Sequence, residues 1–424
     1  MKVAVVGYDI NPVDVSESVV AAEWLRIIDR HHTVTAITDE RHRIGLLSGN
    51  YPNTRFVYIK TQPKVRRFER ISGLRGLGAK RFFARAKQEL IEAGAGNFDV
   101  IHCLTPFGIY ATNSLYELEV PVLVGPLGGG LVTPRNFGRA FRRQPLRTYG
   151  RDALYKLLLR RHKWKNYMAN ASLILVGTEY VRSLIPGSLH DRCIRMFDTV
   201  VDTERFTPGI GRRPGPVRLL FVGRLEGTKG PQLLIEACRR CVERGVSDFV
   251  VEMIGAGRLR RSLERDAAKA GLEGIVQIVG RLTREDVITH YQQADIFCLP
   301  TLREPGGTAI LEAMACGLPV ITSNYGGPRD VVTPECGIRI EMHGYEDYVE
   351  RLAESLVYMI ENPHVRRRMG DVGRRRVEQE YSAVALEGRV VKLYDCVHKN
   401  IIKSEKGSGV ARVGAGSSTK SVRA

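Results

Sequence analysis

Short, continuous apolar runs recur along the chain, and each ends at or near a polar or turn-forming residue. A helical pattern over residues 16–30 follows the first run, and the later runs are spaced widely enough for further helices between them. The predicted strands cover residues 2–7, 33–38, 99–103, 121–125 and 172–177, and then 217–223, 250–255, 276–280, 296–300 and 319–323. Strands that alternate with helices predict α/β sheets, mostly parallel, with helices on both faces.

A breaker-rich passage at residues 207–216 separates the two series of strands. A chain of 424 residues is also too long for a single core. We therefore predict two Rossmann-like doubly wound domains that face a central cleft. The predicted parts are an N-terminal domain over 1–205, a C-terminal domain over 206–382, a crossover helix over 383–403 and a disordered tail over 404–424, which lacks apolar periodicity.

The composition is that of a globular protein, with 43% hydrophobic and 26% charged residues. No apolar run is long enough to cross a bilayer, and the apolar N-terminal stretch is too short for a signal peptide. The eight cysteines are scattered, which favours free thiols in a reducing compartment over a disulfide framework or a zinc site. These features predict a cytoplasmic protein.

Basic residues are concentrated in two stretches of the first half. Residues 60–87 hold ten Lys and Arg against one acidic residue, and residues 135–165 hold eleven against one, an excess larger than the net charge of +18 for the whole chain. Such a field attracts anionic surfaces. The leucine-rich run at 154–165 suits either a core helix or a membrane surface, and Phe82 and Phe83 among basic residues suggest the same membrane partner. A basic face without a partner is the plainer alternative.

The stretch from Pro300 to Val320 carries the most specific chemistry. A strand ends at Pro300, a loop carries Glu304, and Gly306 and Gly307 introduce a helix that carries Glu312. Glycines let a ligand approach the backbone closely, and amide groups at a helix start attract phosphate. Because helical side chains lean toward the N-terminus, Glu312 is expected to reach the same ligand.

Two carboxylates beside a phosphate site suit a ligand that carries hydroxyl groups, because the carboxylates can accept hydrogen bonds from these hydroxyls. Sugars and riboses carry such hydroxyls. The compensating positive charge is expected from the turn after the strand at 217–223, where Arg224 and Lys229 lie in a glycine-rich segment. No Asp-x-Asp triplet occurs in the chain, so we expect no metal at this site and no other cofactor.

These motifs resemble the retaining glycosyltransferases of family 4, which have the GT-B fold. The resemblance extends from Met1 to about Tyr381 and is densest over residues 221–332. The motifs are Glu304-x7-Glu312, Phe221-Val222-Gly223-Arg224-Leu225 with Lys229-Gly230, Gly255-Ala256-Gly257, and Val201-Asp202-Thr203-Glu204-Arg205-Phe206.

The resemblance implies a role for each matching residue. Arg224 and Lys229 would bind the donor diphosphate and stabilise the leaving group, and Glu304 would hold hydroxyls of the donor sugar. Glu312 would take the ribose hydroxyls. The donor site would also include Gly223, Gly255, Arg281 near the base, Gly306, and the phosphate-binding amides of Gly307 and Thr308. Transfer would retain the anomeric configuration and would need electrostatic stabilisation more than a strong protein base.

Two features of the first half are candidates for the acceptor side. His102 is displaced from the histidine before a proline that is common in the family, so it either lies near the reaction centre or is simply packed. Gly128, Gly129 and Gly130 resemble a glycine loop of one branch of the family, although a plain tight turn also explains them.

In the donor site, Gly306 stands where the family usually has a bulky residue. This difference is expected to alter how the enzyme holds the donor sugar.

The resemblance predicts transfer of a sugar from a nucleotide-sugar donor to a glycan or lipid-linked acceptor, in cell-surface polysaccharide or glycolipid assembly. The basic stretches suggest an anionic membrane as a further partner, with the enzyme peripheral on the inner face of the cell membrane. A nucleotide-sugar epimerase or phosphorylase of the same fold is the alternative. A basic nucleic-acid-binding protein is a remoter one, since no recognised motif for nucleic acid appears and we expect no such partner.

Overall fold

The chain divides into two compact units, and each unit contains segments that are distant in the sequence. The computed structural model describes residues 1–13, 17–61, 76–104, 109–110, 112–134, 136–141, 145–197, 199–209 and 214–406. The first unit comprises Met1–Gly130, Tyr155–Asp198 and Glu387–Ala424, and the second comprises Leu131–Leu154 and Thr199–Leu386.

The described residues of the first unit form a seven-stranded sheet in the order β3-β2-β1-β4-β5-β6-β7. Its strands are β1 (Lys2–Val6), β2 (Thr33–Asp39), β3 (Thr54–Ile59), β4 (Val100–Cys103), β5 (Val122–Leu127), β6 (Leu173–Val176) and β7 (Cys193–Arg195). Its helices are α1 (Glu17–His31), α2 (Arg43–Leu47), α4 (Gly76–Glu92), α6 (His162–Asn170) and α7 (Glu179–Leu184), with the end of α5 (Pro145–Arg160) and most of α15 (Ala383–Lys406).

The second unit repeats this plan with a six-stranded sheet in the order β10-β9-β8-β11-β12-β13. Its strands are β8 (Val217–Val222), β9 (Phe249–Ile254), β10 (Val276–Gly280), β11 (Ile296–Leu299), β12 (Val320–Ser323) and β13 (Gly337–Ile340). Its helices are α8 (Pro231–Glu243), α9 (Arg260–Lys269), α10 (Arg284–Gln293), α11 (Thr308–Ala315), α12 (Gly327–Val331), α13 (Tyr345–Glu361) and α14 (Pro363–Glu380).

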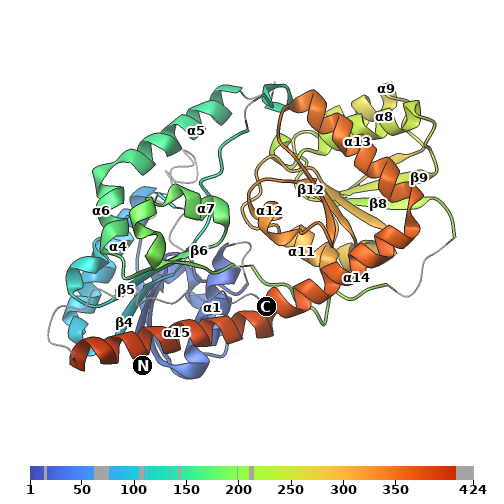
Figure 1. The fold of residues 1–424 in the computed structure, drawn as a ribbon. Coiled ribbons are helices and arrows are strands. Elements are labelled where there is room, and N and C mark those ends of the chain that lie inside the picture. Colours follow the sequence, from blue (N-terminus) through green and yellow to red (C-terminus); the bar gives the residue numbers. More distant parts are fainter. Residues whose placement is uncertain are drawn as a thin grey trace. The chain divides into compact units, whose positions relative to one another are not determined.

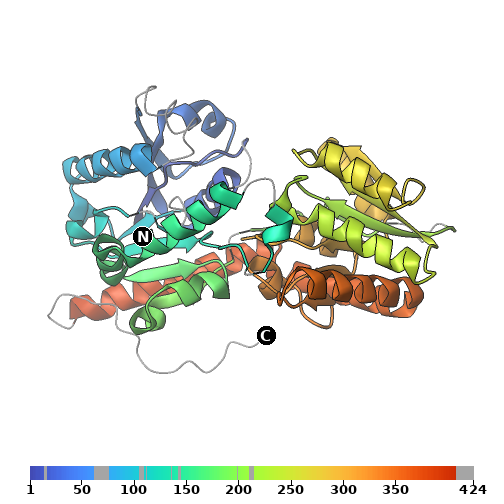
Figure 2. The same ribbon diagram turned by 90° about the horizontal axis from the view of Figure 1, so that it is seen from above.

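All described strand pairs of both sheets are parallel. In each sheet the chain runs outward from a central strand, β1 or β8, and then returns to that strand's other side with β4 or β11. This order defines a doubly wound sheet, in which ligands bind beyond the carboxyl ends of the two central strands. Helices cover both faces of each sheet (Figures 1 and 2). The predicted fold class, two Rossmann-like α/β domains with parallel sheets, is therefore confirmed.

The last helix, α15, is anchored on the first unit by a buried polar contact. The hydroxyl of Tyr394, in α15, lies 2.7 Å from Nδ1 of His102 in β4, and both side chains are fully buried. At the surface, Glu387 pairs with Arg30 at 2.7 Å and with His31 at 3.1 Å. These contacts explain why residues after Glu387 group with the N-terminal sheet.

The division of the structure differs from the predicted boundaries in two places. The units meet in the sequence at residues 198 and 199, against the predicted 205 and 206, and residues 131–154 group with the second unit although they lie in the first half of the chain. The helix predicted over 383–403 extends to Lys406. Residues 407–424 of the predicted disordered tail, and residues 62–75 of the first basic stretch, lie outside the described residues.

Phe82 and Phe83 are core residues, so their interpretation as part of a membrane surface is wrong. Their side chains are 1% and 3% exposed, and the ring of Phe82 lies 5.2 Å from that of Tyr8 in an edge-on contact. The run at 154–165 contains both core positions and surface positions. Trp164 is buried in the core, whereas Leu157 of α5 is 56% exposed. None of the helices in the described part of the chain is both long and apolar enough to cross a bilayer.

Phe82 and Leu157 make a matched pair for a test of these burial assignments. Phe82→Ala should lower the free energy of unfolding by about 3–5 kcal/mol, because it empties a packed site. Leu157→Ala, at an exposed position, should change it by no more than about 0.5 kcal/mol. Chemical denaturation of both variants measures the difference, and equal effects would contradict the packing described for α4.

Candidate functional site

The carboxyl ends of the second sheet carry all the residues assigned to donor binding. Gly223 and Arg224 follow β8, Gly255 follows β9, and Arg281 follows β10. The loop with Glu304 follows β11 and leads into α11. Because β8 and β11 are neighbours and parallel, their carboxyl ends lie side by side at the switch point of the sheet.

Close backbone contacts join the loops after β8 and β9. A Cβ atom on Gly255 would lie 1.9 Å from the carbonyl oxygen of Gly223, and one on Gly257 would lie 2.3 Å from that of Leu225. Gly255 also has a φ of +145°. The amide of Leu225 donates to the carbonyl of Ala256 at 2.9 Å. Glycine is therefore required at residues 255 and 257 by the backbone itself.

The turn after β8 and the loop after β11 are joined in the same way. A Cβ atom on Gly230 would lie 2.0 Å from the carbonyl oxygen of Pro300. The carbonyl of Thr228 accepts the amide of Leu302 at 2.9 Å and the hydroxyl of Thr301 at 2.9 Å. These bonds fix the position of Lys229 relative to the loop that carries Glu304.

Lys229 and Glu304 form an ion pair at this junction. The ammonium group of Lys229 contacts Oε2 of Glu304, and the two side chains are only 16% and 11% exposed. The other carboxylate oxygen of Glu304, Oε1, accepts the amide of Gly307 at 3.1 Å. The structure thus brings together three predicted site residues, and it gives the Gly307 amide a protein acceptor that the sequence did not predict.

Helix α11 starts directly beside this ion pair. Gly307 is its N-cap residue, with a φ of +88° that favours glycine. A Cβ atom on Gly306 would lie 3.0 Å from the hydroxyl of Thr199, so little room exists there for the bulky residue usual in the family. Thr308 is the first residue of the helix and is exposed. The partial positive charge of this helix end is therefore next to the Lys229 ammonium.

Glu312 lies in α11 and is held by two residues of α10. Its Oε2 is 3.1 Å from the hydroxyl of Tyr291, and its Oε1 is 3.8 Å from a guanidinium nitrogen of Arg284. Burial raises the pKa of Glu312 above its ordinary value, and the charge of Arg284 and the Tyr291 hydroxyl oppose this rise. Neither partner was identified from the sequence, because no local pattern connects α10 with α11.

Arg224 and Arg281 lie at the more exposed positions of this sheet edge. The Arg224 side chain is 68% exposed and pairs with Glu226 at 3.2 Å. Arg281 is also exposed. The structure places both at the carboxyl edge, as predicted from the order of strands, and their roles toward a ligand stay predictions. In the described part of the chain, no group of three or more His, Cys, Asp or Glu residues is arranged to hold a metal ion.

The candidates for the acceptor side belong to the first unit. Both ring nitrogens of His102 have partners, Tyr394 at 2.7 Å and the carbonyl of Gly125 at 2.8 Å. Burial lowers the pKa of His102 to about 4. This is the environment of a packed, neutral histidine. Pro106, the proline of the family's motif, lies outside the described residues.

The glycine run from Gly128 to Gly130 ends where the chain passes into the second unit. Gly129 and Gly130 have φ values of +81° and +74°. The amide of Gly130 donates to the hydroxyl of Tyr110 at 3.1 Å, and a Cβ atom there would lie 2.7 Å from Leu184. Packing alone therefore accounts for glycine at residue 130, and contact of this loop with an acceptor stays a prediction.

Comparison with known proteins finds relatives of the segment that carries these residues. Residues 202–376 match the family model described as "Glycosyl transferases group 1". A GDP-mannose-dependent monoacylated alpha-(1-6)-phosphatidylinositol monomannoside mannosyltransferase from Corynebacterium glutamicum is 31% identical over 223 residues, which are 48% of this chain and 55% of that protein. A D-inositol 3-phosphate glycosyltransferase from Corynebacterium jeikeium is 31% identical over 44% of this chain and 49% of its own length. The chain thus spans about half the length of these relatives.

Solved structures match the whole architecture. A sucrose-phosphate synthase from Thermosynechococcus elongatus superimposes with a TM-score of 0.63 at 17% identity, covering 94% of this chain and 99% of the other. A glycosyltransferase from Rickettsia africae gives a TM-score of 0.62 at 16% identity, covering 94% and 99%. At such identity the likeness concerns the fold. Together the comparisons identify a glycosyl transferases group 1 domain over residues 202–376, in a chain with two Rossmann-like domains of GT-B type.

Proposed function

We propose that the chain is a retaining, metal-independent glycosyltransferase of family 4, which moves a sugar from a nucleotide-sugar donor to a glycan or lipid-linked acceptor. The observation that supports this most directly is the junction of Lys229, Glu304 and the start of α11 at the switch point of the second sheet. A cation, a carboxylate and a helix N-terminus at one point suit a ligand with a diphosphate next to hydroxyl groups.

In this proposal the second unit binds the donor. Lys229, Arg224 and the N-terminus of α11 stabilise the diphosphate as negative charge develops on it when the sugar leaves. Glu304 accepts hydrogen bonds from the donor sugar, and Glu312 accepts them from the ribose. The positive charge needed at the leaving group thus comes from protein side chains and a helix end, which is why the proposed reaction needs no metal.

The names of two curated relatives support an acceptor that carries an inositol phosphate, which is attached to a lipid in the first of them. One is named as acting on a phosphatidylinositol mannoside with GDP-mannose, and the other as acting on D-inositol 3-phosphate. Both acceptors carry phosphate on an inositol ring. An acceptor of this class, used in cell-surface polysaccharide or glycolipid assembly, agrees with the basic excess of the first half of this chain.

Transfer is tested by incubating the purified chain with UDP-glucose, GDP-mannose and ADP-glucose and analysing the products. We expect stabilisation against heat by one of these donors, and a new glycoside when a phosphoinositol acceptor is added.

Lys229→Ala should lower turnover roughly 10²–10³-fold, the cost of one lost oxyanion donor. A fully active Lys229→Ala enzyme would contradict the assigned role, and an epimerised nucleotide sugar without transfer would favour the alternative reaction.

Donor binding should weaken at low pH because of Glu312. Its pKa is raised by burial, so the group takes up a proton at a higher pH than an ordinary glutamate as the pH falls. The protonated form accepts fewer hydrogen bonds from the ribose hydroxyls. The dissociation constant for UDP or GDP should therefore rise toward acid pH. In Glu312→Gln, binding should be weak at all pH values, and an unchanged pH profile in this variant would assign the effect to another group.

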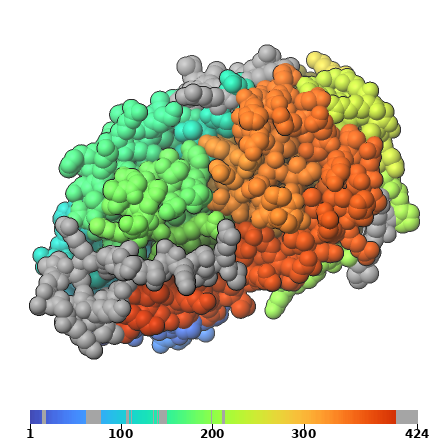
Figure 3. All heavy atoms as spheres, viewed as in Figure 1, coloured from blue at the N-terminus to red at the C-terminus, as the bar shows by residue number. Residues whose placement is uncertain are grey.

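Helix α5 supports a peripheral place on the inner face of the cell membrane. Leu154 and Leu157 are 38% and 56% exposed, and the basic residues Lys156, Arg160 and Arg161 of the same stretch are also exposed. Figure 3 shows the surface with the part of the chain around α5 in green. Exposed leucines among cations are typical of a helix that lies in the headgroup region of an anionic membrane. The side chains of Arg142, Arg143 and Arg147, in the same basic stretch, lie outside the described residues.

Vesicle flotation tests this surface. Replacing Lys156, Arg160 and Arg161 by Glu should reduce binding to phosphatidylglycerol vesicles at least about tenfold, since each basic residue near such a surface contributes about 1 kcal/mol. The matched control reverses Arg367, Arg368 and Arg375, which are exposed on α14. Equal losses in both variants would mean that net charge alone, and not α5, determines binding.

A further inference from the structure

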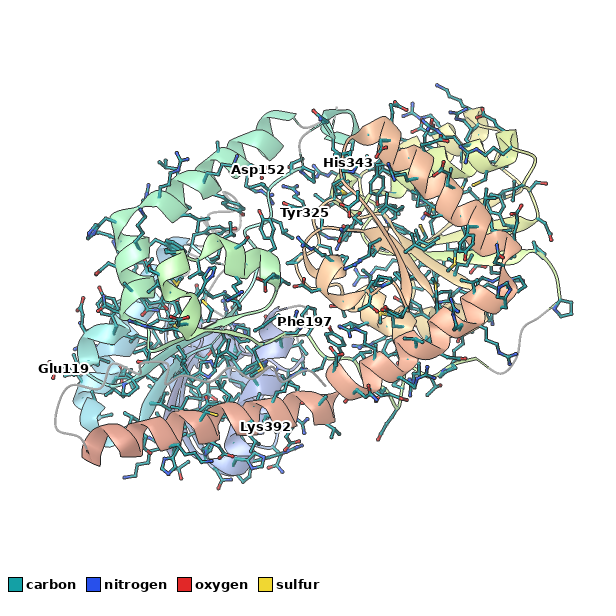
Figure 4. The ribbon with its side chains drawn as sticks, in the orientation of Figure 1. Glu119, Asp152, Phe197, Tyr325, His343 and Lys392 are labelled. Atoms are coloured by element: carbon teal, nitrogen blue, oxygen red, sulfur yellow. The ribbon has the colours of Figure 1, made fainter. Side chains whose placement is uncertain are left out.

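A segment from the first half of the chain is built into the second unit, next to the loop that carries Glu304. We call this segment, Leu131–Leu154, the arm. Phe137 is fully buried, with its ring 5.6 Å from that of Tyr348 in α13. The hydroxyl of Tyr325 donates to the carbonyl of Val132 at 2.9 Å. Figure 4 labels Tyr325 and Asp152.

Asp152 lies near the end of the arm and is buried, with only 7% of its surface exposed. One carboxylate oxygen accepts the amide of Thr133 at 2.7 Å, which closes the arm on itself. The other lies 2.9 Å from a nitrogen of Arg151 and 3.6 Å from a guanidinium nitrogen of Arg303. A carboxylate that is removed from water in this way depends on its cationic partners.

Arg303 connects the arm with the donor loop because it directly precedes Glu304. Its side chain is 11% exposed and pairs with Asp152, and its amide donates to the carbonyl of Thr228 at 3.2 Å. Thr228 is the neighbour of Lys229. Lys229 is therefore next in sequence to a residue that Arg303 contacts, and Glu304 is next in sequence to Arg303 itself.

The first residue of the arm lies near Gly326, in a segment that packs against the same loop. The carbonyl of Glu304 accepts the amide of Gly327 at 2.9 Å. A Cβ atom on Gly326 would lie 2.6 Å from that carbonyl and 3.0 Å from a methyl group of Leu131, the first residue of the arm. The two ends of the arm thus lie near the donor loop, one at Arg303 and the other at Gly326.

We propose that Asp152 is a positioning residue for the donor-sugar site, and that it acts through Arg303 on the placement of Glu304. The inference rests on the proposed function, in which Glu304 binds hydroxyls of the donor sugar. The nucleotide part of the donor depends on Glu312 and the turn after β8, which Asp152 does not contact in the described structure. Loss of the Asp152 charge should therefore affect the sugar more than the nucleotide.

Calorimetric titration of Asp152→Asn with UDP, UDP-glucose, GDP and GDP-mannose tests this separation. The asparagine still accepts the Thr133 amide but removes the negative charge of Asp152 from its ion pair with Arg303. For the nucleotide that the wild type prefers, the affinity for the diphosphate should stay within about twofold. The affinity for the corresponding nucleotide sugar, and kcat for transfer, should each fall about 10- to 100-fold, because a small misplacement of a binding group has an effect of this size. Asp191→Asn, at an exposed position of the first unit, is the matched control and should match the wild type.

Variants of Arg303 show whether Asp152 acts through it. Arg303→Gln should reproduce the effect of Asp152→Asn, the double variant should be no worse than the poorer single variant, and Arg303→Lys should recover part of kcat. The inference is overturned if the two effects add, or if Asp152→Asn weakens diphosphate and nucleotide sugar equally with a lower Tm, as for general loss of structure. If the wild type binds the compounds and Asp152→Asn has the same affinities and the same kcat, this inference alone is overturned. A wild type that binds none of them overturns the proposed function as well.

Discussion

The carbonyl group of Thr228 is the point on which the candidate site depends. It joins the turn after β8 to the loop after β11 by accepting hydrogen bonds from Thr301, Leu302 and Arg303. Gly230 permits this approach, because any Cβ atom there would collide with the backbone at Pro300. The two loops are consequently fixed relative to one another, and the side chains of Lys229 and Glu304 meet across the junction. The backbone arrangement thus brings the two members of the ion pair within reach of each other.

The sequence predicted the central strands of both sheets but not three of the outer ones. Strands β3 and β7 are the edges of the first sheet, and β13 is an edge of the second. An edge strand is covered less completely, so it needs no continuous apolar run. In β3 the residues Thr54, Arg55 and Tyr58 accordingly leave no continuous apolar run, and most of the strand is only partly buried. The patterns of hydrophobicity were therefore strongest where the sheet is most enclosed.

The candidate site shows the same division between local and distant information. The placement of Lys229, Glu304 and Glu312 followed from strand ends and one helix start, which are local in the sequence. The contacts of Tyr291 with Glu312, and of Asp152 with Arg303, join segments with no shared pattern. The interpretation of Phe82 failed for a related reason. Its basic neighbours suggested a surface, but helical periodicity directs Phe82 and Phe83 inward while Lys80, Arg81 and Arg85 remain exposed.

The interleaved course of the chain restricts how its halves can be exchanged between relatives. A fragment that begins at residue 206 would lack Phe137 and leave the Tyr348 ring without its aromatic neighbour, and one that ends at residue 205 would lack Tyr394 and uncover His102. Recombination at a single point would thus break buried contacts in both products. A viable hybrid would have to carry Leu131–Leu154 with the half that follows it and α15 with the half that precedes it, so these segments should be inherited with their distant partners.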